Sequence, residues 1–283
     1  TTYTKSESLS TNSISTIYIA NNNDKYIGTD SGLYILDTSW NWSFYDSTWG
    51  MLNNTVEEIT EYDGKIFIAH WNGISELDPN NGMSATSYNI YANKFYKSNS
   101  WELYVTWNNQ LRMYNTLTKA WDTIYTSTVW VTYDLVITET GDIWLACQSW
   151  ISHYDGISWS TYDNITVWMS VIQEIEIIDD VIYFGGEYPN NEGFMSFDGN
   201  TWKSYGVNDG LLSESISTLK VDNRNRLWIG TNNGINIYQP ESDSFDWFDE
   251  SYGLINNEIN DIHISQNELW ASTENWISKW IFK

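Results

Sequence analysis

The stretch Arg226-Leu-Trp-Ile-Gly-Thr-Asn-Asn-Gly-Ile-Asn-Ile-Tyr238 has the pattern of a β-hairpin. Leu227 to Thr231 is apolar and rich in residues that favour strands. Asn232-Asn233-Gly234 follows, and these residues tolerate the positive φ angles of a tight turn. Ile235 to Tyr238 then alternates apolar and polar residues, as a half-buried returning strand does. The stretch therefore predicts two antiparallel strands joined by a short turn.

Variants of this hairpin recur about every forty residues along the chain, which is the spacing of a repeat protein. The copies begin at Tyr26, Phe67, Tyr104, Trp144, Tyr183, Leu227 and Trp270. A further strand precedes each hairpin, such as Ile216 to Val221, and another follows it, such as Phe245 to Phe248. Four short strands per repeat are typical of a β-propeller blade. We therefore expect an all-β fold, a seven-bladed β-propeller with four antiparallel strands per blade, in which residues 1–283 form a single domain.

The two ends of the chain complement each other. The seventh copy, Trp270 to Trp280, stops before a fourth strand, whereas Tyr3 to Asn12 resembles a fourth strand with no hairpin before it. Pairing the two would remove two open sheet edges. We expect the N-terminal strand to join the last blade. The opening Thr1-Thr2-Tyr3 is what we expect of a mature secreted protein or of a piece of a longer chain or assembly.

Composition narrows the classes of partner. Thirty-seven acidic against thirteen basic residues give a formal net charge of −24, which repels nucleic acid and anionic membrane surfaces. No run of about eighteen apolar residues exists, so we expect no direct membrane insertion. The single Cys147 excludes an intramolecular disulfide and a zinc–thiolate cluster, and we expect it to be buried and inert.

The segment from Asp209 to Ile235 resembles the two-component regulator propeller repeat. The resemblance implies a ligand-binding sensor propeller, since such repeats usually form extracytoplasmic domains of hybrid histidine kinases and often sense oligosaccharides. It also implies an extracellular, cell-surface or periplasmic location. The chain departs from that arrangement, because no transmembrane, kinase or DNA-binding segment follows the repeats in this sequence.

Propeller geometry places two kinds of connection on one face: the turn between the second and third strands of each blade, and the inter-blade loop that leaves the outer strand. Aromatic side chains beside amides at these turns suit sugar rings, which have apolar C–H faces and hydroxyl edges. The alternative is that the Asn residues only form turns and the Trp residues fill gaps. The predicted ligand-binding residues on this face, called here the turn face, are Trp71, Asn72, Trp107, Asn108, Trp150, Asn232, Asn233, Asn275 and Trp276.

Two of these tryptophans stand where other blades have glycine. Trp150 and Trp276 align with Gly32, Gly73 and Gly234. A bulky residue at a positive-φ turn position is strained. Either the turn has changed shape and exposes a ligand-stacking indole, or the gene comes from an organism that reads UGA as glycine. An intact mass that matches eighteen Trp would exclude the second explanation.

Other tryptophans and the histidines have structural explanations. The shared second-strand position should be buried in every blade, with Trp144, Trp228 and Trp270 as core residues. His70, His153 and His263 lie in different repeats without metal-ligand spacing, so we expect structural histidines. Asp222-Asn-Arg-Asn225 lacks the pattern of a calcium loop and predicts an Asx-type turn.

Cofactor sites are weakly indicated. We expect no cofactor, apart from a Ca²⁺ ion for which Glu187, Asn190 and Glu192 offer oxygens in an insertion. Acidic pairs such as Glu57-Glu58 and Asp179-Asp180 could serve glycoside hydrolysis, but they are uninformative in so acidic a chain.

Three functions fit the sequence. The first is a non-enzymatic extracytoplasmic propeller that binds an oligosaccharide or a protein ligand on the turn face. The second is an enzyme, a polysaccharide-degrading lyase or hydrolase on a propeller scaffold. The third is a structural cell-surface or adhesin subunit. The first is the predicted function.

Overall fold

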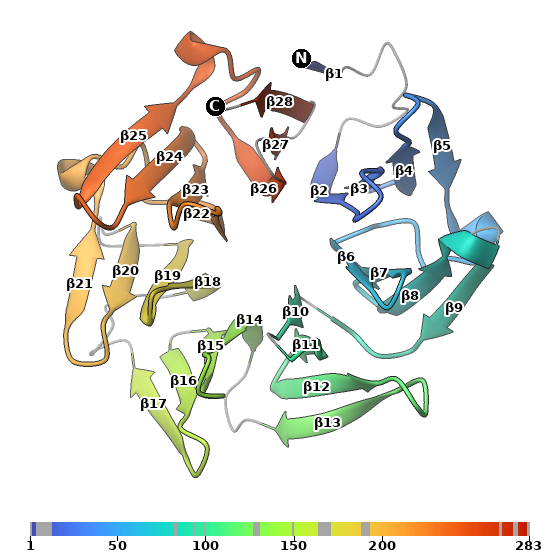
Figure 1. Ribbon diagram of the computed structural model, residues 1–283, viewed down its shortest axis with the longest axis horizontal. Coiled ribbons are helices and arrows are strands. Elements are labelled where there is room, and N and C mark those ends of the chain that lie inside the picture. The colour runs from blue at the N-terminus through green and yellow to red at the C-terminus, as the bar shows by residue number, and fades with distance from the viewer. Residues whose placement is uncertain are drawn as a thin grey trace. The chain divides into compact units, whose positions relative to one another are not determined.

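The computed structural model describes residues 2–3, 13–81, 84–92, 94–98, 100–126, 131–148, 150–163, 171–187, 193–265, 268–273 and 277–281. These residues form seven antiparallel sheets of four strands each (Figure 1). The chain divides into two compact units, Thr1–Phe95 with Asn260–Lys283, and Tyr96–Ile259. The predicted all-β, seven-bladed propeller is confirmed, and the single-domain organisation of residues 1–283 stays a prediction.

The first unit contains blades one, two and seven. Blade one consists of β2 (Ile14–Ile19), β3 (Lys25–Thr29), β4 (Leu33–Leu36) and β5 (Trp42–Tyr45). Blade two consists of β6 (Glu58–Tyr62), β7 (Lys65–His70), β8 (Gly73–Asp78) and β9 (Ser84–Tyr88). Blade seven consists of β26 (Ile259–Ser265), β27 (Glu268–Thr273), β28 (Ile277–Ile281) and β1 (Thr2–Tyr3).

The N-terminal strand β1 completes blade seven. Thr2 pairs with Ser278 and Tyr3 pairs with Ile277 in an antiparallel ladder. Strand β28 therefore has a partner on each side, because β27 pairs along its other edge. The predicted closure is confirmed, and it covers a sheet edge that would otherwise expose unpaired backbone groups.

The second unit contains blades three to six, with the unit boundary falling inside β10. Blade three consists of β10 (Lys94–Lys97), β11 (Leu103–Trp107), β12 (Gln110–Asn115) and β13 (Ala120–Thr126). Blade four consists of β14 (Thr132–Ile137), β15 (Ile143–Cys147), β16 (Trp150–Tyr154) and β17 (Trp159–Asp163). Blade five consists of β18 (Val171–Ile178), β19 (Val181–Glu187), β20 (Phe194–Phe197) and β21 (Trp202–Tyr205). Blade six consists of β22 (Ile216–Val221), β23 (Leu227–Thr231), β24 (Gly234–Gln239) and β25 (Ser244–Phe248).

Short 3₁₀ helices follow the fourth strand of blades one, five and six and the third strand of blade two. They are η1 (Ser47–Trp49), η2 (Pro79–Asn81), η3 (Val207–Asp209) and η4 (Glu250–Tyr252). Asp46 and Asp249 cap η1 and η4 by accepting hydrogen bonds from the backbone N–H groups of Thr48 and Ser251. None of the helices in the described part of the chain has the length and hydrophobicity needed to cross a lipid bilayer.

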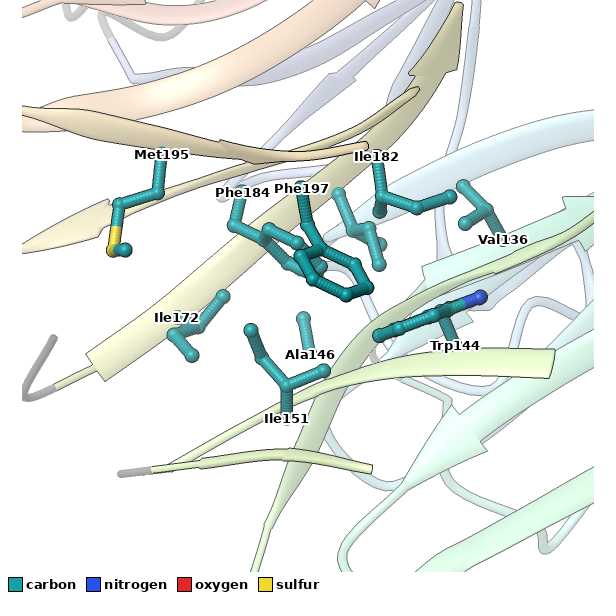
Figure 2. Packing of buried hydrophobic residues seen from close by; sticks show 10 residues of the cluster. Val136, Trp144, Ala146, Ile151, Ile172, Ile182, Phe184, Met195 and Phe197 are labelled. Carbon is teal, nitrogen blue, oxygen red and sulfur yellow. The ribbon is translucent and has the colours of Figure 1, made fainter. Parts of the chain in front are cut away.

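Large side chains on the second strands fill the space between sheets. As predicted, the shared aromatic position is buried in every blade, with exposed fractions of 9% or less for Tyr26, Phe67, Tyr104, Trp144, Tyr183, Trp228 and Trp270. Figure 2 shows the packing between blades four and five, where Trp144 and Ala146 face Phe184 and Phe197. Burying such rings contributes to the hydrophobic stabilisation of these two blades.

Buried carboxylates link the first strands of neighbouring blades. Asp134 Oδ2 accepts a hydrogen bond from the backbone N–H of Ile175 at 3.2 Å. Glu174 Oε2 accepts one from the N–H of Leu219 at 3.4 Å. Asp261 links blades seven and one in the same way. Asp134 and Glu174 each follow a register shift in their first strand, where a bulge re-aims the side chain.

Candidate functional site

Two adjoining cavities open at the turns between the first and second strands of blades four and five. Each has a volume of about 360 Å³, and both are lined by Thr138 and Asp180. One extends to Tyr96 and Ile177, and the other to Trp144 and Phe197, all within the second unit. We call the two cavities together the acidic groove. Their volumes lie in the range of small-ligand sites, about 300–1,000 Å³.

Four carboxylates line the acidic groove: Glu139, Asp142, Asp179 and Asp180. No lysine or arginine is among the described residues that line it. Asp179 and Asp180 form the β18–β19 turn with φ angles of 48° and 66°, a left-handed pair typical of a tight hairpin. Both oxygens of Asp179 accept hydrogen bonds from Asn225 Nδ2 at 3.1 Å, which fixes that side chain.

The outer end of the groove is aromatic. His153 stacks on Trp144 with ring centroids 3.9 Å apart and an interplanar angle of 15°. Tyr162 lies on Trp144 at 5.8 Å and 14°. His153 Nε2 is 3.2 Å from Asp142 Oδ2. Asp142 Oδ1, the second oxygen of this carboxylate, accepts a hydrogen bond from the hydroxyl of Thr140. The imidazole is therefore held by a carboxylate at one nitrogen and by an indole face.

The inner end of the groove carries a fixed hydroxyl. Tyr96 Oη donates a hydrogen bond to the carbonyl oxygen of Ile137 at 3.1 Å. Burial raises the pKa of Tyr96, so the phenol stays protonated at neutral pH. The groove as a whole combines negative charge with apolar and aromatic walls, which favours a ligand that carries a cationic group on an apolar or planar body.

The described residues of the turn face lie at the predicted turns. Trp71 and Asn72 form the β7–β8 turn, and the Trp71 side chain is 59% exposed. Asn108 has a φ of 50° in the β11–β12 turn. Asn232 and Asn233 are exposed in the β23–β24 turn, where Asn233 Nδ2 donates to the carbonyl oxygen of Leu212 at 3.2 Å. None of these residues lines the acidic groove, and their role in binding stays a prediction.

Other predicted residues are partly or wholly outside the described chain. Trp107 ends β11 and pairs with Gln110. Asn275 and Trp276 lie outside the described residues, as do Asn190 and Glu192, and Glu187 is described only as the last residue of β19. The structure therefore leaves the predicted calcium site untested. Within the described ranges, no group of three or more His, Cys, Asp or Glu side chains is arranged to hold a metal ion.

Trp150 occupies the same ladder position as the glycines of other blades. It pairs with Cys147, as Gly73 pairs with His70 and Gly234 with Thr231. A Cβ atom added at Gly73 would lie 2.4 Å from the carbonyl oxygen of Tyr88, too close for any side chain. Blade four must therefore pack differently at this corner, and the indole Nε1 of Trp150 is buried there without a hydrogen-bond partner in the structure.

Backbone strain of the kind expected at Trp150 occurs at two other tryptophans. Trp101 has a φ of 60° and Trp40 a φ of 66°, both in the left-handed region. Trp101 lies in the turn between β10 and β11, at the position that Gly141 and Asn225 hold in blades four and six. Each of the three residues donates its backbone N–H to the carbonyl oxygen of the residue three positions earlier. Sequence comparison of the hairpins missed these positions because they lie in different turns.

The predictions for His70, Cys147 and the Asp222 turn are confirmed. His70 is buried, and its nitrogens contact the carbonyl oxygen of Thr55 at 2.7 Å and Ser75 Oγ at 2.9 Å. Cys147 is fully buried, and burial raises the pKa of its thiol to about 11. Asp222 accepts a hydrogen bond from the N–H of Arg224, as an Asx-type turn requires.

The acidic groove was missed because its residues are ordinary in sequence. Asp179-Asp180 is one acidic pair in a chain with thirty-seven carboxylates, and the absence of metal-ligand spacing around His153 predicts a structural histidine. His153 does lie in a third strand as predicted, but it lines a cavity. The available signal was the recurrence of carboxylates in the first turns of two consecutive blades, which a propeller places side by side.

The comparisons with known proteins agree with this fold. Residues 210–233 match the family model described as two component regulator propeller. The resemblance predicted from Asp209 to Ile235 is therefore confirmed for this repeat. A search of curated proteins gives no match.

Solved propellers resemble nearly the whole chain at low identity. A streptogramin B lyase structure matches with a TM-score of 0.77 and 11% identity, covering 99% of this chain and 96% of that chain. PorZ, a surface component of the type-IX secretion system of Porphyromonas gingivalis, matches with a TM-score of 0.70 and 11% identity, covering 94% and 46%. The extracellular domain of the BT4673 system from B. thetaiotaomicron matches with a TM-score of 0.52 and 16% identity, covering 92% and 45%.

These likenesses establish the fold and not the activity. This chain spans about half the length of PorZ and of the BT4673 domain. The neighbours include a lyase, a component of a secretion system and the extracellular domain of a one-component system, so one propeller scaffold carries unrelated functions.

Proposed function

We propose that this chain is a non-enzymatic recognition propeller that works outside the cytoplasm and binds a protein partner through basic side chains. The observation that supports this most directly is the acidic groove, with four carboxylates and no cation among its described lining residues. An arginine or lysine entering it would meet several carboxylates, each worth up to about 4 kcal/mol at 4 Å near a protein surface before desolvation is subtracted. The extracellular domain among the fold neighbours supports the location.

The geometry suits a guanidinium group in particular. His153 lies at the outer end with the buried Trp144 ring stacked behind it, and planar arginine packs on an aromatic ring such as this imidazole more readily than lysine does. Asp142 lies beside this stack, so its carboxylate can accept hydrogen bonds from a cation that approaches the imidazole. The net charge of −24 would also draw a basic partner toward the surface and raise the association rate at low salt.

Calorimetric titration with tetra-arginine, tetra-lysine and tetra-glutamine peptides tests this proposal. We expect tetra-arginine to bind most tightly, with an affinity that falls as salt rises. The double variant Asp142→Asn with Asp180→Asn should weaken binding at least tenfold, whereas Glu241→Gln, which alters an exposed carboxylate in blade six, should not. Equal weakening by both variants, or equal binding of the glutamine peptide, would contradict a specific groove.

One observation favours an enzyme as a second candidate. His153 and Asp142 form a histidine–carboxylate pair beside a cavity, an arrangement that serves general-base catalysis in lyases and hydrolases. A lyase is among the fold neighbours. Incubation with polysaccharides, followed by detection of new reducing ends or unsaturated products, separates the two candidates. Product that disappears in His153→Gln would establish the enzyme, and binding without product would favour recognition.

A further inference from the structure

A third cavity lies at the outer strand of blade six, away from the acidic groove. It has a volume of about 350 Å³ and is lined by Arg226, Ile237, Asp246, Trp247, Phe248 and Tyr252. The lining comes from β24, β25, η4 and the residue that precedes β23, and all of it lies in the second unit. We call it the aromatic corner. It shares no lining residue with the acidic groove.

Two of its rings are exposed to an extent that the fold does not require. Trp247 is 47% exposed and Tyr252 is 61% exposed. Their centroids are 6.4 Å apart with planes at 86°, so the two rings form a right-angled corner. In blade five the corresponding positions are Ser204 and Asp209, which shows that a blade of this protein folds without the aromatic pair.

Blade one has aromatic residues at the same positions but uses them differently. Phe44 lies 4.6 Å from the ring of Tyr34, and Trp49 lies 5.7 Å from the ring of Tyr45. These rings pack on neighbouring aromatics of the same blade, although Phe44 is 37% exposed and Trp49 is 63% exposed. In blade six the Trp247 and Tyr252 rings contact each other at the mouth of a cavity.

The polar groups of the aromatic corner are held in place. Asp246 Oδ2 accepts a hydrogen bond from Gln239 Nε2 at 2.8 Å. Arg226 Nε donates to Asp222 Oδ2 at 2.7 Å, and the guanidinium lies 5.3 Å from the ring centroid of Trp228. A fixed carboxylate and a fixed guanidinium beside exposed rings can pair with hydroxyl groups without first losing rotamer entropy.

The charge of the corner differs from that of the acidic groove. Arg226 and Asp246 are its charged lining residues, one of each sign, and Arg226 is also ion-paired with Asp222, so the corner carries much less net charge than the four carboxylates of the acidic groove. An ion would gain little electrostatic free energy in the aromatic corner. A neutral ring with an apolar face and a polar edge matches both the exposed aromatic rings and the polar side chains of the corner. Pyranose sugars have this character, because their axial C–H groups pack on aromatic rings and their hydroxyl groups hydrogen-bond to planar side chains.

We infer that the aromatic corner is a binding site for a neutral oligosaccharide, with Trp247 and Tyr252 contacting a pyranose ring and Asp246 and Arg226 bonding its hydroxyl groups. This site shares no residue with the acidic groove or with the ligand-binding residues predicted on the turn face. The sequence predicts sugar recognition at turn tryptophans such as Trp71, whereas this aromatic cavity lies on the outer strand of blade six.

Titration calorimetry of the full chain with cellotetraose, maltotetraose, mannotetraose and chitotetraose tests the inference. We expect at least one of these sugars to bind. Trp247→Ala and Tyr252→Ala should each weaken that binding tenfold or more, while Trp247→Phe, which keeps a ring, should lose less. Asp246→Asn should weaken binding by a smaller factor, because an amide still offers one acceptor oxygen.

Trp71→Ala is the matched control, since Trp71 is comparably exposed at 59% but lies on the turn face. It should leave the affinity unchanged, as should the double variant of the acidic groove. Urea unfolding of each variant verifies that the fold is kept, which the exposure of both rings favours. The inference is overturned if none of the four sugars binds, if binding survives both alanine changes at the corner, or if only Trp71→Ala abolishes it.

Discussion

The carboxylate of Asp222 holds the first turn of blade six, and removing it should destabilise the whole blade. Its side chain is fully buried. Oδ1 accepts hydrogen bonds from the backbone N–H groups of Arg224 at 2.9 Å and Arg226 at 3.0 Å. Oδ2 accepts from Arg226 Nε at 2.7 Å and from the buried indole Nε1 of Trp228 at 2.9 Å. Asp222→Ala would remove all four hydrogen bonds at once.

The expected loss in the free energy of unfolding depends on the hydrogen-bond donors that stay buried after the carboxylate is removed. Hydrogen bonds to a charged group contribute about 1.5–3 kcal/mol each, and a buried donor left without a partner costs about 1–3 kcal/mol. These values are not additive within one network, and breaking a buried ion pair from one side costs about 3–5 kcal/mol. We expect Asp222→Ala to lower the free energy of unfolding by about 3–5 kcal/mol. Asp222→Asn, which keeps one acceptor oxygen, should cost about 1–3 kcal/mol.

The pH dependence has a definite sign. Burial acts to raise the pKa of Asp222, but hydrogen bonds from Trp228, Arg226 and Arg224 outweigh it and lower the pKa below the ordinary 3.8. The charged form is thus favoured in the folded state. The stabilisation is present above about pH 4 and is lost as the pH falls through the folded-state pKa. Asp222→Asn should therefore lose less stability than the unchanged chain on acidification.

Urea unfolding followed by tryptophan fluorescence and by circular dichroism measures the effect. Asp198→Ala is the control, because Asp198 accepts from the N–H groups of Asn200 and Thr201 in the same kind of turn but in an exposed position. It should change stability far less. A loss of only about 0.5 kcal/mol for Asp222→Ala, the range of ordinary surface changes, would contradict this role of the buried carboxylate. So would an equal loss in the control.

Two further changes probe the strained turn and the buried thiol. Trp101→Gly should raise the free energy of unfolding by about 0.5–1 kcal/mol. A left-handed backbone costs a non-glycine residue about 1–2 kcal/mol, and the greater unfolded-state entropy of glycine cancels part of the gain from relieving that strain. A variant that is destabilised in urea unfolding would show that contacts of the indole outweigh the strain. Cys147 should resist iodoacetamide in the folded chain until the pH approaches about 11, the raised pKa of its buried thiol. The free energy of unfolding should fall as the pH rises above 9.0, the ordinary pKa of a cysteine thiol, because between these two values only the thiol of the unfolded chain ionises. Rapid alkylation of the folded chain at neutral pH would contradict its burial.

Much of the fold could be predicted because the same pattern of residues occurs in several repeats of the chain. The hairpin at Leu227 to Tyr238 recurs with the same alternation, so strand count, blade number and the buried position of Trp228 all follow from local periodicity. The joining of β1 to β28 also followed, because an incomplete blade at one end and a spare strand at the other leave one consistent pairing. These features depend on neighbours that are close in sequence or on simple strand counting.

The sites could not be predicted in the same way. Trp247 and Tyr252 are two aromatic residues among many until the blade brings their rings to a right-angled corner beside Arg226 and Asp246. Asp142 and Asp180 come from consecutive blades, and only the packing of blade four on blade five lines one cavity with both. The turn positions Trp71 and Asn233 were located correctly, but their place at a turn says nothing about a cavity.

The repeat pattern of the sequence is enough to predict the seven blades, their four strands, the buried second-strand aromatics and the strand that completes blade seven. Each of these follows from side-chain periodicity and hydrogen-bond pairing within about forty residues or between the two chain ends. The tertiary structure alone decided where side chains from different strands and blades converge. It produced the acidic groove, the aromatic corner and the left-handed Trp101, because cavities and backbone angles depend on how blades and turns pack and not on the repeat pattern itself.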